Sequence, residues 1–424
     1  MDNEIYDYSK DIKFNINLSL KNKSYAIHFL NNLSENLGII GNKQGKYLAH
    51  FKNISANLML LYFNGIGEFV YYSRNNNHYK NIKRYNPNNL SIRKIVAVIK
   101  LLIKHKFIDH RGGNYKRYSK ESSYRSRIRP TLKFLSLMRK NFITRKHICE
   151  LDSDCIILKN AKKNLNDYKD DEYTKRIRSE CLSYNSSLAY YKISLANCKP
   201  VNKYLKENDV NFNNKSYYRV FNRDFKHGGR FYGPWWLHQI PSGLRQYMLI
   251  NKNKTVEYDY SSLIIHQIYS EKGLNYFEEN TYSNDPYTLK DIPESQREIN
   301  KAIIQIALNC RDFESLNDAL IYEFKKGNLK GNKPKKEEVK KRLNIFREMN
   351  PRIYEYVYSK CALRFQYQDS EIARDVIRKC SRNLIPVLCV HDSFIVEYKN
   401  SNFIIDAMNS ATKEARLTSI PLIK

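Results

Sequence analysis

The sequence lacks the features of a membrane or exported protein. Its 424 residues contain no uninterrupted run of the roughly 18 apolar residues that a membrane helix needs. The first residues, MDNEIYDYSKDIKF, are too polar for a signal peptide. We therefore expect no membrane segment and an intracellular location, which is cytoplasmic or, if a host genome encodes the chain, organellar.

The cysteines lack the spacing of a metal or disulfide framework. The eight cysteines are scattered along the chain, and no two form a C-x-x-C pair. A zinc site is therefore unsupported, and reduced thiols are the expected state. The length exceeds the usual size of a single core, and a hydrophobic content of 42% suffices for real cores, so we expect two or more domains.

Acidic residues are scarce relative to basic ones. The chain has 43 Asp+Glu against 73 Lys+Arg, which gives a formal net charge of +30. Such an excess indicates a polyanionic partner, of which nucleic acid is the commonest. A basic membrane-surface protein would show an amphipathic anchor, and none is present. The abundance of Asn, Lys, Ile and Tyr also fits an AT-rich genome, whose codon bias would supply part of the charge.

Residues 1–145 indicate a mainly helical region that binds nucleic acid. Ser91 is a good N-cap for a helix. Apolar residues then recur at helical spacing: Ile92, Ile95, Val96, Ile99, Leu102 and Ile103. Phe107-Ile108 begins a short strand, Gly112-Gly113 a tight turn, and Pro130 opens another helix at its first turn. This order is the outline of a winged helix; the alternative is an ordinary helical core with a solvated basic turn.

Two aspartates stand at predicted strand ends. Val256 to Asp259 form a short strand that ends at Asp259, and a segment with helical spacing follows. In the stretch VLCVHDSFIVEY, Asp392 lies where one strand gives way to the next. A buried, unpaired carboxylate is costly, so a partner must hold its charge. Two carboxylates on adjacent strand ends can hold two magnesium ions, which activate a hydroxyl and stabilise a leaving pyrophosphate.

A polar stripe lies on the helix predicted between these aspartates. Arg297, Lys301, Gln305 and Asn309 recur every fourth residue and so share one helix face. A stripe that begins with two cations suits a triphosphate, and its lysine could protonate a leaving group. The alternative is a solvated stripe on an amphipathic helix.

An aromatic and glycine-rich segment precedes both aspartates. In GGRFYGPWWLHQIP, Gly228-Gly229 allows a close approach of the backbone. Arg230 with Tyr232, Trp235 and Trp236 could grip a nucleic-acid strand by charge and stacking. The alternative is an aromatic core with a glycine turn.

Taken in order, these segments resemble the family A polymerases, which include bacterial DNA polymerase I and the phage-type single-subunit RNA polymerases. EYDYSS resembles motif A of the DNA enzymes, D-Y-S-x-x-E, and REINK matches the R-x-x-x-K opening of motif B. VHDSF resembles motif C, which is H-D-E in the DNA enzymes and H-D-S in the RNA enzymes. GGRFYGPWWLHQIP is similar to the T-G-R and L-Q-N-I-P segment. The resemblance covers about 222–424 and is closest to small transposon and virophage polymerases.

The resemblance implies a metal site and a right-hand fold. Asp259 and Asp392 would bind two Mg²⁺ ions, with Mn²⁺ as an alternative, and the backbone carbonyl of Tyr260 would assist. The fold would be α/β, with palm, fingers and thumb. We expect the thumb-like helices over 146–210 and the palm and fingers over 211–424, with the fingers at about 291–380.

The resemblance also implies the residues that bind substrates. Arg297 and Lys301 would bind the incoming triphosphate, Arg230 the primer end or template hybrid, and His391 the primer terminus. Three positions depart from the family pattern: Ile264 replaces a sugar-excluding Glu, Asn309 replaces a Tyr, and Gln305 replaces an apolar or aromatic residue. These departures put the choice between dNTP and NTP in doubt.

We therefore expect a monomeric DNA polymerase that acts on a DNA template and primer in the replication of a mobile element, plasmid or virus. One alternative is a single-subunit RNA polymerase or primase, which HDSF favours and DYSS and LHQIP disfavour. The other is a non-catalytic DNA-binding replication factor that keeps the polymerase-like scaffold.

Overall fold

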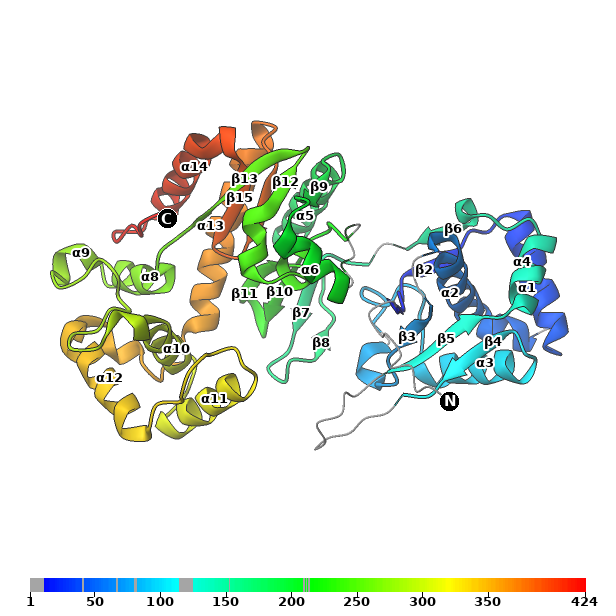
Figure 1. Ribbon diagram of the computed structural model, residues 1–424, viewed down its shortest axis with the longest axis horizontal. Coiled ribbons are helices and arrows are strands. Elements are labelled where there is room, and N and C mark those ends of the chain that lie inside the picture. The colour runs from blue at the N-terminus through cyan, green and yellow to red at the C-terminus, as the bar shows by residue number, and fades with distance from the viewer. Residues whose placement is uncertain are drawn as a thin grey trace. The chain divides into compact units, whose positions relative to one another are not determined.

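The chain forms two compact units of helices and strands. The computed structural model describes residues 11–39, 42–65, 68–79, 82–113, 125–151, 153–208, 210, 212 and 214–424. The first unit comprises Met1–Asp154, Asn164–Asp167 and Leu205–Asp209, and the second Cys155–Lys163, Tyr168–Tyr204 and Val210–Lys424. Each contains helices and sheets (Figure 1), so the predicted α/β class is confirmed.

The first unit packs four helices with a small sheet. The helices are α1 (Ser24–Asn36), α2 (Asn42–Asn64), α3 (Ile92–Lys104) and α4 (Leu132–Lys140). The sheet has the order β1-β3-β5-β4, formed by β1 (Ile12–Lys13), β3 (Val70–Tyr72), β5 (Ser126–Pro130) and β4 (Ile108–Arg111). β2 (Leu18–Leu20) pairs antiparallel with β6 (Ile148–Glu150). The short β8 (Leu165–Asn166) and the 3₁₀ turns Asn76–Tyr79 and Arg145–His147 complete this unit.

The region expected to hold a winged helix contains α3 followed by the antiparallel pair β4 and β5. Ser91 caps α3 as predicted, because its side chain accepts a hydrogen bond from the Lys94 backbone at 3.4 Å. The helix predicted to open at Pro130 is displaced: Pro130 ends β5, Thr131 is the N-cap, and α4 begins at Leu132. Residues 114–124 of the basic turn lie outside the described residues, and the winged helix stays a prediction.

The second unit is built on two sheets. The larger has the order β14-β15-β13-β12-β9, formed by β14 (Val387–Val390), β15 (Ser393–Glu397), β13 (Asn253–Asp259), β12 (Met248–Ile250) and β9 (Ile193–Leu195). The other brings together β11 (Asp224–Tyr232), β10 (Tyr218–Asn222) and β7 (Ile156–Lys159). The long helix α13 (Ala362–Arg382) packs on β11, β14 and α14 (Ser401–Glu414), as Figure 1 shows.

The helices between β13 and α13 have their own hydrophobic core. They are α8 (Leu263–Glu271), α9 (Tyr276–Glu279), α10 (Arg297–Ala307), α11 (Phe313–Lys325) and α12 (Lys336–Met349). Their core is one cluster that runs from Ile265 to Phe365 in the sequence. The remaining helices are α5 (Glu172–Ala189), α6 (Lys199–Glu207) and α7 (Trp235–His238), and 3₁₀ turns cover Ser242–Tyr247, Glu294–Gln296, Pro351–Tyr356 and Tyr398–Asn400.

The described helices and the cysteines bear on the expectations about membrane insertion and thiol state. None of the described helices combines the length and the apolar character needed to cross a membrane. All eight cysteines are free thiols, and five of them are buried.

Candidate active site

Asp259 and Asp392 lie at one edge of the larger sheet. β13 pairs antiparallel with β15, and the last residue of β13, Asp259, is opposite Ser393, the residue that follows Asp392. The Tyr260 amide donates a long hydrogen bond of 3.4 Å to the Asp392 carbonyl. The sequence therefore brings the two carboxylates from distant positions to neighbouring strand ends.

The two carboxylates share a strongly negative environment. Burial first, and the charge of Asp392 second, raise the pKa of Asp259 to about 7. The Lys301 ammonium opposes both effects, so α10 presents a cation toward this edge of the sheet. Like charges close together disfavour ionisation, and a divalent cation would relieve that repulsion.

Two other residues of the α10 stripe, Arg297 and Gln305, contact the side chain of Tyr287. Arg297 forms an ion pair with Asp285 and lies 5.6 Å from the centroid of the Tyr287 ring. Gln305 donates to the Tyr287 hydroxyl at 3.3 Å. Asn309 lies beyond the end of the helix, is exposed, and donates to the Gln305 carbonyl at 3.1 Å. The Asn309 side chain therefore binds the backbone of its own helix, unlike the side chains of Arg297 and Gln305.

Arg230 on β11 is held by Asp369 on α13. The Arg230 Nε lies 2.9 Å and 3.2 Å from the two Asp369 carboxylate oxygens, and its Nη2 also binds Asp369. Burial raises the pKa of Asp369 to about 7, opposed by the Arg230 guanidinium and reinforced by the charge of Asp392. The pair therefore stands within electrostatic reach of the aspartates, although Asp369 has no sequence signal that links it to Arg230.

A second partner group surrounds Glu257. Glu257 accepts two hydrogen bonds of 2.9 Å from Arg245 and one of 2.6 Å from the Ser393 hydroxyl. Glu257 stands two residues before Asp259, and side chains two apart on a strand share a face. Its charge contributes to raising the pKa of Asp259. Sequence reasoning overlooked Glu257, but the period of two along the strand could have found it.

His391 and Tyr260 adjoin the aspartates. His391 has a positive φ of 61°, and its ring lies 5.3 Å from that of Tyr232. Burial lowers the pKa of His391 to about 4, with a further contribution from the Arg230 charge, so the imidazole is neutral. Its buried Nδ1 has no hydrogen-bond partner among the described residues. The Tyr260 side chain points away into the core, where its hydroxyl donates to the Met408 carbonyl at 2.6 Å.

One sequence interpretation changes in the structure. Trp235 and Trp236 have no exposed surface, so the predicted stacking of a nucleic-acid strand on them is wrong and the aromatic-core alternative holds. The Trp236 indole donates to the Tyr217 hydroxyl at 2.9 Å. Ile264, expected beside the sugar of the nucleotide, is partly buried and packs against the core of the helices that follow β13.

The glycine pair explains how β11 meets α13. A Cβ on Gly229 would lie 2.7 Å from the Ser370 Oγ and 2.8 Å from a Phe221 ring carbon. The close approach predicted for this glycine is therefore to α13 and to the neighbouring strand. Arg219 ties the same contact, donating to the Gly229 carbonyl at 2.7 Å and to Ser370 at 3.0 Å.

The donor set of this site fits magnesium bound with a substrate. Within the part of the chain that the structure describes, no three His, Cys, Asp or Glu side chains gather into a metal-binding group. Mg²⁺ is usually held by one or two carboxylates together with substrate phosphates and waters. Asp259 and Asp392 supply such a pair, and the mutual repulsion of their charges favours a cation between them.

Comparisons with known proteins give distant likenesses among solved structures alone. No protein-family model and no curated protein matches this sequence. Among solved structures, the POL domain of Pol1 from M. smegmatis, in complex with DNA primer-template and dNTP, matches with a TM-score of 0.37 and 10% identity. The match covers 59% of this chain and spans half the length of that chain. The functional proposal below therefore rests on the geometry of the site.

Proposed function

We propose that this chain is a template-directed nucleotidyltransferase, and specifically a monomeric DNA polymerase that uses two Mg²⁺ ions. The observation that carries the proposal is the meeting of Asp259 and Asp392 at one sheet edge, with Lys301 in electrostatic contact. A structural scaffold has no physical need for two carboxylates that repel each other at strand ends.

Each residue has a defined part in the proposed reaction. When bound, the metal ions would activate the attacking 3′-hydroxyl and neutralise the leaving pyrophosphate. Asp259 and Asp392 would hold them, with the Tyr260 carbonyl in a supporting position. Lys301 would donate a proton to the pyrophosphate, since its ammonium already interacts with Asp259. Arg297 would bind the triphosphate after exchanging its Asp285 partner for phosphate oxygens.

The proposal extends to the right-hand arrangement. The larger sheet would be the palm, the helices from α10 to α12 the fingers, and α5 the thumb. Support for the fingers comes from the hydrophobic core that α10–α12 share with α8, α9 and Phe365 at the start of α13. Tyr184 of α5 donates to the Val387 carbonyl at 2.7 Å, so the thumb helix would be anchored on the palm at β14.

Primer extension tests the proposal. A template–primer duplex is incubated with dNTPs and NTPs in parallel reactions that contain Mg²⁺ or Mn²⁺. We expect extension by the unmodified chain and at least a thousandfold loss with Asp392→Ala, because the metal site would lose half of its carboxylates. Asp406→Ala removes an exposed carboxylate on α14 and is the matched control.

The outcomes separate the alternatives. A strong preference for NTPs would assign the chain to single-subunit RNA polymerases or primases, and Ser393 after Asp392 is the residue that favours that branch. Tight nucleic-acid binding without incorporation under any of these conditions would instead assign it to non-catalytic replication factors. Full activity in Asp392→Ala would refute the proposed site.

A further inference from the structure

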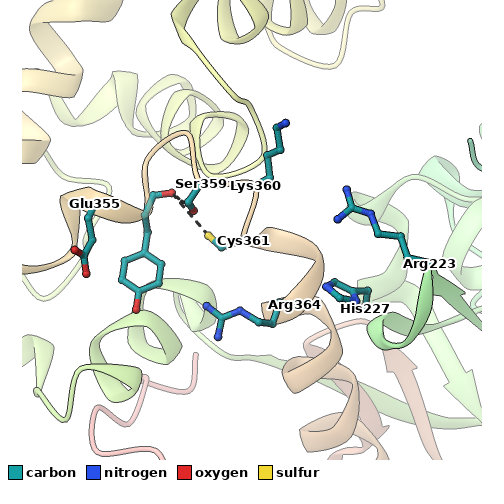
Figure 2. Close-up of a pocket in the computed structure, with 8 residues that line it drawn as sticks. Arg223, His227, Glu355, Ser359, Lys360, Cys361 and Arg364 are labelled. Carbon is teal, nitrogen blue, oxygen red and sulfur yellow. Dashed lines mark hydrogen bonds between the residues drawn. The ribbon is translucent and has the colours of Figure 1, made fainter. Parts of the chain in front are cut away.

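A basic hollow lies between the tip of the β10–β11 hairpin and the start of α13. Its volume is about 540 Å³. The hairpin contributes Arg223 and His227, the segment before α13 contributes Lys360, and the first turn of α13 contributes Arg364 (Figure 2). All of these residues belong to the second unit.

Two of these cations have no carboxylate partner. Arg364 is bound by Glu271, and Glu355, the acidic residue of the lining, is bound by Lys272. For Arg223 and Lys360, both exposed, no ion pair is found among the described residues. The hollow therefore carries a net positive charge that comes mainly from these two side chains.

The backbone holds both free cations at defined places. Arg223 has a φ of 68° and Lys360 a φ of 59°, a left-handed conformation that costs a non-glycine residue about 1 kcal/mol or more. The Arg223 amide donates to the Lys159 carbonyl at 2.6 Å, which fixes the hairpin tip on β7. Two basic side chains are thus presented from rigid turns toward one hollow.

The strand and hairpin next to the hollow carry further lysines, and the exposed Asp224 of the hairpin pairs with His227 at 2.7 Å. Lys159 ends β7, the exposed Lys162 and Lys163 follow it, and Lys226 is exposed on the hairpin. The Tyr356 ring in the lining is engaged by Lys272, and its hydroxyl donates to Glu271 at 2.8 Å. A hollow lined by cations and without a free aromatic face suits the phosphates of a strand and does not suit recognition of a base.

We propose that this hollow binds the phosphate backbone of a nucleic-acid strand, without sequence preference, at a distance from the carboxylate pair. This inference deepens the proposed function and rests on it for the identity of the strand as template or product. α13 links the two sites, because it carries both Arg364 and Asp369, the partner of Arg230.

The fold sets the spacing along the strand. Arg364 and Asp369 are five residues apart on a helix, which is about 7.5 Å at a rise of ~1.5 Å per residue. Arg230 on β11 is opposite Val220 on β10, and Arg223 in the hairpin turn is three residues beyond Val220, which is about 10 Å along the hairpin at ~3.3 Å per residue. At ~3.4 Å per nucleotide, the contacted phosphates would lie about two to three nucleotides from the Arg230–Asp369 pair.

A matched pair of double variants tests the inference. Arg223→Asn with Lys360→Asn removes two charges from the hollow, and asparagine tolerates a positive φ. Lys252 and Arg416 are exposed basic residues elsewhere in this unit with φ of 71° and 57°, so Lys252→Asn with Arg416→Asn is the control. Fluorescence anisotropy measures binding of a labelled single-stranded oligonucleotide at several salt concentrations, in EDTA and without nucleotide. The result is therefore independent of catalysis.

The slope of log affinity against log salt is the decisive quantity. Each phosphate contact to a single strand contributes about 0.7 to that slope, so the hollow variant should lose about 1.4 and the control close to nothing. Equal slopes in both variants, or no oligonucleotide binding by the unmodified chain, would overturn the inference. Titration calorimetry with inorganic phosphate is the second arm: loss of phosphate binding in the hollow variant with an unchanged oligonucleotide slope would identify a small-anion site and also overturn it.

Discussion

Replacement of Gly229 by alanine should separate β11 from α13 and disturb the candidate active site. Gly229 has a φ of 83°, and its missing side chain leaves room for Ser370 and Phe221. The next residue, Arg230, is held by Asp369, which lies next to Ser370 on α13. A methyl group at this position therefore acts on the contact that positions the Arg230 guanidinium.

Two destabilising effects add in the Gly229→Ala variant, namely backbone strain and overpacking. An L-residue in the left-handed region costs about 1–2 kcal/mol. A Cβ at 2.7 Å from Ser370 Oγ and 2.8 Å from Phe221 forces these groups apart, and overpacking of this kind costs about 1–3 kcal/mol. The reduced entropy of the unfolded chain offsets about 0.5–1 kcal/mol. We expect the free energy of unfolding of the second unit to fall by about 1–4.5 kcal/mol.

Urea unfolding followed by tryptophan fluorescence measures this change. The chain has two tryptophans, Trp235 and Trp236, and both are fully buried in the second unit. Their emission therefore reports the unfolding of that unit alone. The shift in the unfolding midpoint, multiplied by the slope of the transition, gives the change in free energy.

Two other glycines separate the costs. Gly273 has a φ of 70°, but a Cβ there would meet nothing within 4 Å, so Gly273→Ala should show only the backbone cost of about 1 kcal/mol. Gly243 has neither a positive φ nor a close neighbour, so Gly243→Ala should change the free energy by less than about 0.5 kcal/mol. A Gly229→Ala variant no less stable than Gly273→Ala would refute the packing argument. Primer extension should fall in Gly229→Ala alone.

Two further substitutions test the electrostatics of the second unit. Glu257→Gln removes a negative charge beside Asp259, so the Mg²⁺ concentration for half-maximal incorporation should rise about threefold to tenfold. Ser393→Ala removes a hydrogen bond to Glu257 but keeps that charge, so the same Mg²⁺ concentration should change less. Burial lowers the pKa of His266 to about 4, below its ordinary value near 6.5. Between these pH values the unfolded chain binds a proton that the folded chain does not, so stability is lost as the pH falls. His266→Asn should flatten the dependence of unfolding free energy on pH in this window by up to about 1.4 kcal/mol per unit. An unchanged slope would show that His266 is not the titrating group.

Local signals in the sequence predicted some elements well. Ser91 is both the best N-cap candidate before an apolar periodic segment and the observed cap of α3. The strand that ends at Asp259 and the helix that contains Arg297 and Lys301 are also where the sequence predicts them. In these segments, capping chemistry and hydrophobic period agree with the tertiary packing.

Other elements depend on packing that a sequence does not display. The first forty residues look polar and irregular, yet α1 forms because Phe29, Leu30 and Leu33 find a buried partner surface. Trp235 and Trp236 are equally compatible with an exposed stacking platform and a core. Only the fold decides between the two, since Tyr217 and Phe212 pack against them.

The candidate site also combines residues that the sequence predicts with residues that only the fold reveals. Asp259 and Asp392 could be paired from the sequence because Asp259 ends a strand, Asp392 lies in the turn between two strands, and both segments carry a family resemblance. Asp369 could not, because it lies in the middle of a polar helix face, and its contact with Arg230 depends on how α13 crosses β11. Glu257 is intermediate, since its spacing from Asp259 predicts a shared face but not its bonds to Arg245 and Ser393.

The four cations proposed to meet nucleic acid or nucleotide fall into two groups. Two of them form ion pairs with carboxylates, and two do not. Arg230 and Arg297, which would meet substrates near the aspartates, are each held by a carboxylate, Asp369 and Asp285. Such a carboxylate keeps a partly buried guanidinium in one orientation, and a phosphate can replace it by bidentate exchange. Arg223 and Lys360 are exposed and need no such partner. Contact of a strand with these outer cations would therefore precede exchange at the inner ones, because it displaces only counterions and water.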